Sequence, residues 1–164
     1  MVSNGRRQYS RQQGDLAEQR FIDACTAIGY EVKKATAQED IYEHIDYWVK
    51  RRENWYGVDV KGNRHPETIW VEFKNVRGNE GWLHGSAHFI AFDIAEQGGF
   101  IVILREELVD WCVLNVENTF VGKQDAYKKL YQREGRSDVL TKIHLTDLKE
   151  LKSFKLLRYA TSYT

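Results

Sequence analysis

Acidic residues recur at a fixed interval through three stretches of the chain whose composition favours β-strands. Thirteen residues separate Asp46 from Asp59, and the same number separates Asp59 from Glu72. Turn-forming residues lie midway in both intervals, so two hairpins would place Asp46 opposite Asp59 and Asp59 opposite Glu72. Carboxylates directly opposite one another repel and destabilise a sheet. The arrangement therefore predicts a site where a divalent metal ion holds them together.

A lysine follows each of the last two acids at a spacing of two. Lys61 follows Asp59 and Lys74 follows Glu72, with apolar residues on both sides of each acid. Because side chains alternate between the faces of a strand, each lysine shares a face with its carboxylate. Carboxylate oxygens suit Mg²⁺, and a neighbouring lysine could position or help deprotonate a water, or stabilise a pentavalent phosphate. The pattern is typical of metal-dependent chemistry on phosphate.

Composition excludes several other classes of protein. A length of 164 residues predicts one domain, and 42% apolar residues, with five Trp, nine Tyr and seven Phe, exclude a disordered chain. No apolar run approaches the roughly 20 residues of a membrane span, and the polar start is not a signal peptide. The phosphate-loop motif is absent from the sequence, so we expect no nucleotide cofactor. Two cysteines without a C-x-x-C pair favour a reducing compartment. We therefore expect a cytoplasmic protein, in the host cytoplasm if it is phage-encoded, with no membrane partner.

The order of elements follows from periodicity and turn residues. We interpret residues 1–13 as a flexible basic arm and residues 14–164 as a single domain. Apolar residues at helical spacing predict a helix over 15–28, in which Asp15 would be the N-cap. The glycine-punctuated segment 75–88 is expected to be a loop or short helix over the sheet. The predicted strands cover 30–36, 45–51, 56–61, 68–74, 89–92, 100–104 and 139–145, with further helices over 105–114 and 147–152.

This order resembles that of the PD-(D/E)xK nuclease superfamily, most closely the small Holliday junction resolvases of archaeal and phage type. The similarity covers residues 12–104 and rests on three motifs. They are Gly14-Asp15-Leu16-Ala17-Glu18 at the helix, Ile45-Asp46-Tyr47-Trp48-Val49 at the first acidic strand, and Gly57-Val58-Asp59-Val60-Lys61-Gly62 at the acid-x-Lys strand. Asp59 takes a position that most members fill with Glu.

The resemblance implies an α/β fold with a restriction-endonuclease-like core, a central mixed β-sheet flanked by helices. It also implies hydrolysis of DNA phosphodiesters near the branch of a four-way junction by a homodimer, dependent on Mg²⁺ with Mn²⁺ as a substitute. Its expected catalytic residues are Glu18, Asp46, Asp59 and Lys61, and its expected metal ligands are Asp46, Asp59, Glu18 and Glu72. The alternatives are another nuclease of this superfamily, restriction-like or a recombination exonuclease, and a catalytically inactive DNA-binding module.

Three assignments stay open at the level of sequence. Asp59, Glu72 and Lys74 would be the catalytic set if the acid-x-Lys strand were the later one. Glu18 stands three residues after a candidate N-cap, as in a capping box, so its alternative role is to cap its own helix. A histidine pair at 84 and 88 has the spacing of zinc ligands on a helix, but the nearby glycines argue against a rigid helix and no third ligand is evident.

Basic residues supply candidate DNA contacts even though the net charge is formally zero. They are Arg6, Arg7 and Arg11 in the arm, Arg77 beside the glycine-rich segment, and Lys128 and Lys129 in the basic stretch 123–136. Tyr127 and Tyr131, spaced like helical neighbours, are expected to stack on DNA or to pack in the core.

Overall fold

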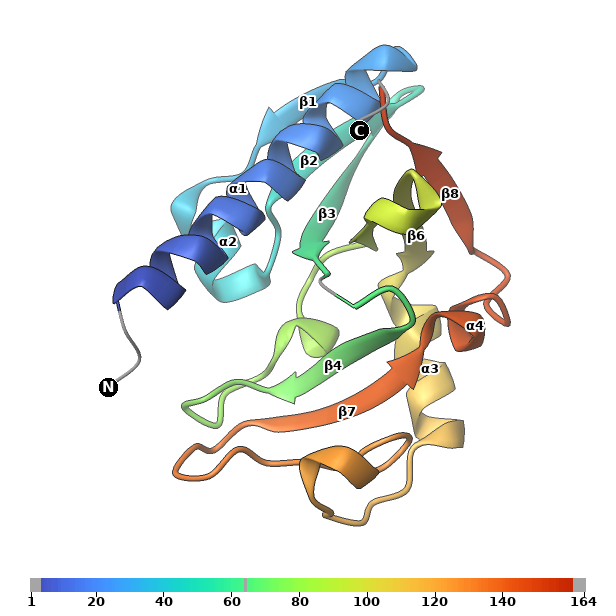
Figure 1. Ribbon diagram of the computed structural model, residues 1–164. Helices are drawn as coiled ribbons and strands as arrows, with labels where there is room; N and C mark the ends of the chain where they lie inside the picture. The colour runs from blue at the N-terminus through green and yellow to red at the C-terminus, as the bar shows by residue number, and fades with distance from the viewer. Residues whose placement is uncertain (1–3, 64, 161–164) are drawn as a thin grey trace.

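Six strands form the central sheet of the protein, in the spatial order β1-β2-β3-β5-β6-β8 (Figure 1). The computed structural model describes the backbone of residues 4–63 and 65–160, and the side chains of residues 1–11 and 13 lie outside the described residues. Only the β3–β5 pair is parallel, which makes the sheet mixed. The strands are β1 (Glu31–Lys34), β2 (Tyr47–Arg51), β3 (Asn54–Gly62), β5 (Phe89–Ile94), β6 (Gly99–Leu104) and β8 (Lys155–Arg158). The expected α/β class, with helices flanking a mixed sheet, is confirmed.

One long helix, α1 (Asn4–Ala27), covers one face of this sheet. Its apolar side chains Ala17, Phe21 and Cys25 pack against β2, β3, β5 and β6. The helix begins about three turns before the predicted start, so Asp15 lies inside it and is not its N-cap. The interpretation of Glu18 as a capping residue is therefore wrong. The side chains of Arg6, Arg7 and Arg11 lie outside the described residues.

A short helix that the periodicity did not indicate, α2 (Ala37–Glu43), precedes β2. Thr36 accepts a hydrogen bond from the Glu39 amide, and the Glu39 carboxylate accepts one from the Thr36 amide, which is a complete capping box. The remaining short helices are η1 (Trp82–His84), η2 (Ala95–Gln97), η3 (Lys123–Asp125) and α4 (Leu145–Leu148).

The opposite face is covered by a two-stranded ribbon and by α3 (Arg105–Asn115) (Figure 1). The ribbon pairs β4 (Thr68–Lys74) with β7 (Val139–His144), far apart in sequence. The prediction that Asp59 faces Glu72 is wrong, because β5 occupies the open edge of β3 and Glu72 pairs with Leu140 instead. The chain runs from β3 to β5 through the ribbon strand and η1, with no α-helix between them.

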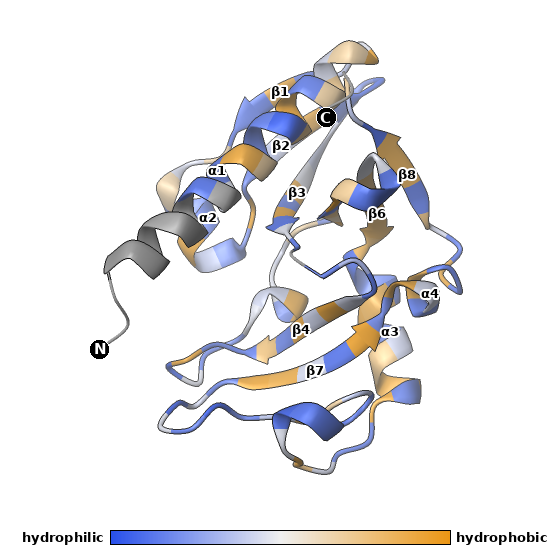
Figure 2. Cartoon of the chain, viewed as in Figure 1, coloured by the Kyte–Doolittle hydropathy of each residue, from blue (hydrophilic) through white to orange (hydrophobic). Residues whose placement is uncertain are grey.

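Two apolar clusters hold these layers together. The larger lies between the sheet and the ribbon, η1, α3 and α4, and the smaller lies under α1. Leu108, Trp111 and Cys112 of α3 are buried in the larger cluster. Figure 2 shows hydrophobic residues on β6 and β7 and hydrophilic ones along most connecting segments. None of the helices in the described ranges has the length and apolar character needed to span a lipid bilayer.

A pair of Gly→Ala substitutions tests this packing. At Gly99 a Cβ would lie 2.2 Å from the Leu157 carbonyl oxygen, so Gly99→Ala must displace β8 from β6. We expect a loss of about 1–3 kcal/mol in the free energy of unfolding, measured by urea denaturation. At Gly14, inside α1, a Cβ would meet nothing within 4 Å, and Gly14→Ala should stabilise the protein by about 0.5–1 kcal/mol. Equal effects at the two positions would contradict the described strand pairing.

Candidate active site

Asp46 and Asp59 face each other across the β2–β3 hairpin. The register pairs Tyr47 with Val58, so Asp46, the residue before β2, lies opposite Asp59. This part of the predicted hairpin geometry is confirmed. The Val60 amide donates a hydrogen bond of 2.7 Å to Asp46 Oδ2, which orients this carboxylate along β3.

Alternation along β3 places Asp59 and Lys61 on the face away from α1. Asp59 and Lys61 are register partners of Ile90 and Phe92 in β5, both of which belong to the larger apolar cluster. The intervening Val60 belongs to the cluster under α1. The strand therefore anchors the site through its apolar side chains, as the acid-x-Lys pattern predicts.

Lys61 covers the buried carboxylate of Asp59. Its Nζ lies 3.1 Å from Asp59 Oδ1, and the side chain of Lys61 is 30% exposed whereas that of Asp59 is 3% exposed. The same ammonium lies 5.3 Å from the ring centroid of Trp82, which is buried in η1. The segment 75–88 thus reaches over the site, as expected for a functional loop. Lys61 is the part of this pair that a bound molecule can touch.

Burial raises the pKa of both aspartates. Burial and then the nearby charge of Asp59 raise the pKa of Asp46 to about 8. Burial raises the pKa of Asp59 as well, while the ammonium of Lys61 opposes this rise. Asp59 Oδ2 is buried and has no hydrogen-bond partner among the described residues. An unpaired buried carboxylate oxygen is strongly unfavourable unless a cation or a proton occupies it.

This donor set fits one divalent cation of the Mg²⁺ type. Mg²⁺ takes one or two protein carboxylates and keeps several waters, which matches a facing carboxylate pair with one unpartnered oxygen. Within residues 14–63 and 65–160, no three Asp, Glu, His or Cys side chains gather closely enough to form a metal site by themselves. The predicted four-acid ligand set is therefore not assembled, and the two aspartates form its centre.

Glu18 lies near this pair, whereas Glu72 lies in the β4–β7 ribbon. Burial and then the charge of Asp46 raise the pKa of Glu18, so the α1 carboxylate lies within electrostatic reach of the site. Glu72 is in the separate ribbon and packs against Gly81, where a Cβ would come within 2.8 Å of Glu72 Cγ. Lys74, at the end of the same strand, is exposed. The structure thus brings together Asp46, Asp59 and Lys61 in one sheet, and does not bring Asp59, Glu72 and Lys74 together in this way.

The histidine pair forms no metal site in the described part of the chain. His88 Nδ1 accepts a hydrogen bond of 2.9 Å from the Gly57 amide, and its ring packs against Trp48 and Tyr56. His84 lies beside Phe73. His88 therefore serves the packing of β3, a role that no feature of the sequence indicated.

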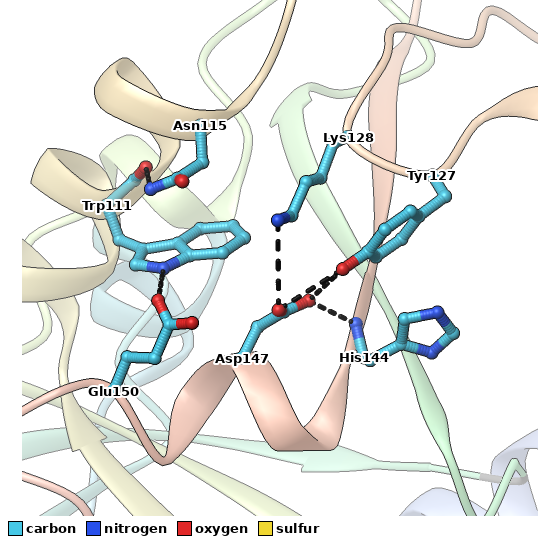
Figure 3. Close-up of polar contacts among 7 residues, drawn as sticks. All are labelled: Trp111, Asn115, Tyr127, Lys128, His144, Asp147 and Glu150. Carbon is cyan, nitrogen blue, oxygen red and sulfur yellow. Dashed lines mark hydrogen bonds and ion pairs between the residues drawn. The ribbon is translucent and has the colours of Figure 1, made fainter.

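Lys128, predicted to contact DNA, belongs to a polar cluster around Asp147 (Figure 3). Tyr127 donates its hydroxyl to Asp147 Oδ2 at 3.0 Å, and Lys128 Nζ lies 4.0 Å from Asp147 Oδ1. That ammonium also lies 5.4 Å from the ring centroid of Trp111. Through these contacts the segment before β7 is held against Trp111 of α3 and Asp147 of α4. Arg77 is exposed and Lys129 half-buried, and their contact with DNA stays a prediction.

Comparisons with known proteins give one structural likeness. A scan against protein-family models and a search of curated proteins find no match. Among solved structures, a bacterial homing endonuclease, I-Ssp6803I, is similar with a TM-score of 0.46 and 17% sequence identity, over 61% of this chain and 72% of that one. A likeness at this level does not define the activity of this chain.

The raised pKa of Asp46 predicts a pH-dependent gain in stability for Asp46→Asn. A carboxyl whose pKa is higher in the folded state destabilises the protein above its unfolded pKa, increasingly up to about pH 8. We expect the variant to exceed the natural protein in free energy of unfolding by about 2 kcal/mol at pH 8.5, and by much less at pH 5. Urea denaturation in a chelator at several pH values measures this.

Asp110→Asn, at an exposed position on α3, is the matched control and should show no such trend. A difference between Asp46→Asn and the natural protein that stays constant from pH 5 to 8.5 would contradict the electrostatic account of the site.

Proposed function

We propose that this protein is a metal-dependent endodeoxyribonuclease that hydrolyses DNA phosphodiesters. The observation that supports this best is the convergence of Asp46, Asp59 and Lys61 at the β2–β3 hairpin, with one buried carboxylate oxygen that no described residue hydrogen-bonds. Clustered, partly buried carboxylates with raised pKa values are typical of functional sites rather than of structural ones. An inactive DNA-binding module would have no reason to keep this unfavourable pair.

Each residue has a distinct role in the proposal. Asp46 and Asp59 would hold Mg²⁺, with Mn²⁺ as a substitute, and the bound ion would polarise the scissile phosphate and activate an attacking water. The ammonium of Lys61 would stabilise the negative charge that develops on the phosphate, because it is the exposed part of the Asp59 pair. Glu18 and Glu72 would assist from the margin of the site.

Within this activity, we propose a structure-selective enzyme of the Holliday junction resolvase type. The support for this is that the motifs of residues 12–104 resemble those of resolvases. The runner-up is a restriction-like enzyme or exonuclease with the same chemistry.

The two cysteines are compatible with the proposed cytoplasmic location. Burial raises the pKa of both cysteine thiols to about 12, which makes them unreactive.

Substitutions in the site test the assignment of roles. Asp46→Asn, Asp59→Asn and Lys61→Ala should each lower Mg²⁺-dependent cleavage at least about 100-fold while DNA binding is kept. Lys74→Ala, the matched control from the other acid-x-Lys sequence, should keep near-natural activity, and Glu72→Gln should fall between these. Cleavage of labelled DNA under single-turnover conditions measures the rates. An inactive Lys74→Ala with an active Lys61→Ala would move the site to the ribbon.

Substrate preference and oligomeric state test the finer proposal. Symmetrical cleavage of a four-way junction needs two active sites, and hence a homodimer with twofold symmetry. We expect paired nicks near the branch, slow turnover of linear duplex and single strands of the same sequence, and a dimer mass by light scattering. Equal turnover of linear duplex, or a monomer that remains active, would favour the restriction-like or exonuclease alternative.

A further inference from the structure

The β4–β7 ribbon has one face turned toward the core and one turned outward. Ile69 and Val71 of β4 are buried in the larger apolar cluster. Trp70, between them, points to the other face, where its register partner on β7 is Lys142. Both side chains are partly exposed, and Lys142 Nζ lies 5.2 Å from the centroid of the Trp70 ring. The outer face therefore presents an aromatic ring and a cation side by side.

A cavity joins this outer face to the candidate active site. It has a volume of about 320 Å³ and lies between the end of β3 and the start of β4. The side chains that line it include Lys61 and Asn63, from the end of β3 and the segment that follows it, and Ile69 and Trp70 of β4. The volume is at the lower end of the roughly 300–1,000 Å³ of small-molecule sites, which suits one nucleotide rather than a stacked duplex. Trp70 thus shares this cavity with the proposed catalytic lysine.

Lys142 differs from the other lysines that contact aromatic rings near the site. Lys61 and Lys128 are each paired with an aspartate, whereas Lys142 forms no ion pair with any residue that the structure describes. Glu72 lies two residues along β4 on the same outward face, where its register partner is Leu140. An ammonium over an aromatic ring and without a carboxylate partner remains available to a phosphate.

The segment before β7 holds this surface in place. The Tyr131 ring centroid lies 5.7 Å from that of Trp70, and the Tyr131 amide donates a hydrogen bond of 2.8 Å to the Leu140 carbonyl. The Lys128 amide donates to the Lys142 carbonyl at 3.0 Å, and the polar cluster around Asp147 anchors that segment (Figure 3). Because the ring is supported on the protein side, little ordering is needed when a ligand stacks on it.

We propose that Trp70 and Lys142 form a subsite for an unpaired nucleotide next to the scissile phosphate. The base stacks on Trp70 at the mouth of the cavity, and Lys142 contacts a phosphate of the same strand. Bases inside an intact duplex are stacked on their neighbours, so only DNA with an unpaired nucleotide at the cleavage point can fill the subsite. This inference rests on the proposed nuclease function and narrows its substrate to DNA in which a nucleotide at the cleavage point is unpaired, or becomes unpaired, at a branch, fork or flap.

The test is DNA binding by the full chain in a chelator, where no cleavage occurs. Trp70→Ala should weaken binding of a single-stranded oligonucleotide and of a forked duplex about 5- to 150-fold, the range expected for loss of one base stack. Binding of a fully paired duplex should be unchanged. Trp70→Phe should restore most of the affinity, and Lys142→Gln should reduce the salt dependence by about one unit of log–log slope. Fluorescence anisotropy measures the DNA affinities of the natural protein and the three variants, and thermal unfolding verifies that each is folded.

The chain supplies a matched control in Trp55, which is 40% exposed on the β2–β3 hairpin and has Lys50 Nζ 5.9 Å from its ring centroid. Trp55→Ala should leave every affinity unchanged. Natural single-strand affinity in Trp70→Ala, or an equal loss in Trp55→Ala or on paired duplex, would overturn the inference. If Trp70→Ala does not fold, an unchanged salt slope in Lys142→Gln would overturn it.

The two proposals fail separately. A protein that shows these binding differences but cleaves no DNA with Mg²⁺ would overturn the nuclease function and leave a nucleic-acid subsite. A protein that cleaves DNA but binds it equally well with and without the Trp70 ring would overturn the subsite alone.

Discussion

The burial of Asp59 opposite Asp46 is the constraint on which the site depends. The hairpin sets the two carboxylates face to face, and the β3–β5 pairing closes the sheet around Asp59. Lys61 neutralises one oxygen of Asp59, and the other has no hydrogen-bond partner in the part of the chain that the structure describes. Folding alone would favour an apolar residue at this position, because a buried charge with an unpartnered oxygen destabilises the folded state. The arrangement is understandable if a divalent cation completes it.

The Asp46–Asp59 pair could be predicted from sequence because its hairpin is local. Two strands joined at Arg52 and Glu53 must pair with each other, and the register then follows from the short turn. The same thirteen-residue spacing failed for Glu72. There the outcome depends on competition between distant segments, since β5 takes the edge of β3 and β7 takes β4. The residue pattern around Glu72 does not indicate that β5 pairs with β3 or that β7 pairs with β4.

Two further differences between the sequence-based predictions and the structure have equally specific causes. The helix that carries Glu18 starts before the predicted residue 15 because nothing in residues 4–14 prevents a helix. No apolar periodicity in those residues indicates one. The sequence predicts that Lys128 contacts DNA, but its ammonium lies in a cluster with Asp147 and Trp111, which are distant from it in sequence. The sequence pattern supplies the residue types of the candidate site, and tertiary contacts decide which of them meet.

Calorimetric titration with Mn²⁺ or Mg²⁺ tests the central claim most directly, since it needs neither substrate nor an assumption about it. The natural protein should bind one divalent ion per chain, more tightly at pH 8.5 than at pH 6 because protons compete for Asp46. Asp59→Asn should abolish this binding, and Lys74→Ala should leave it intact. A protein that binds no divalent ion at either pH, or an Asp59→Asn variant that binds it equally well, would contradict the account.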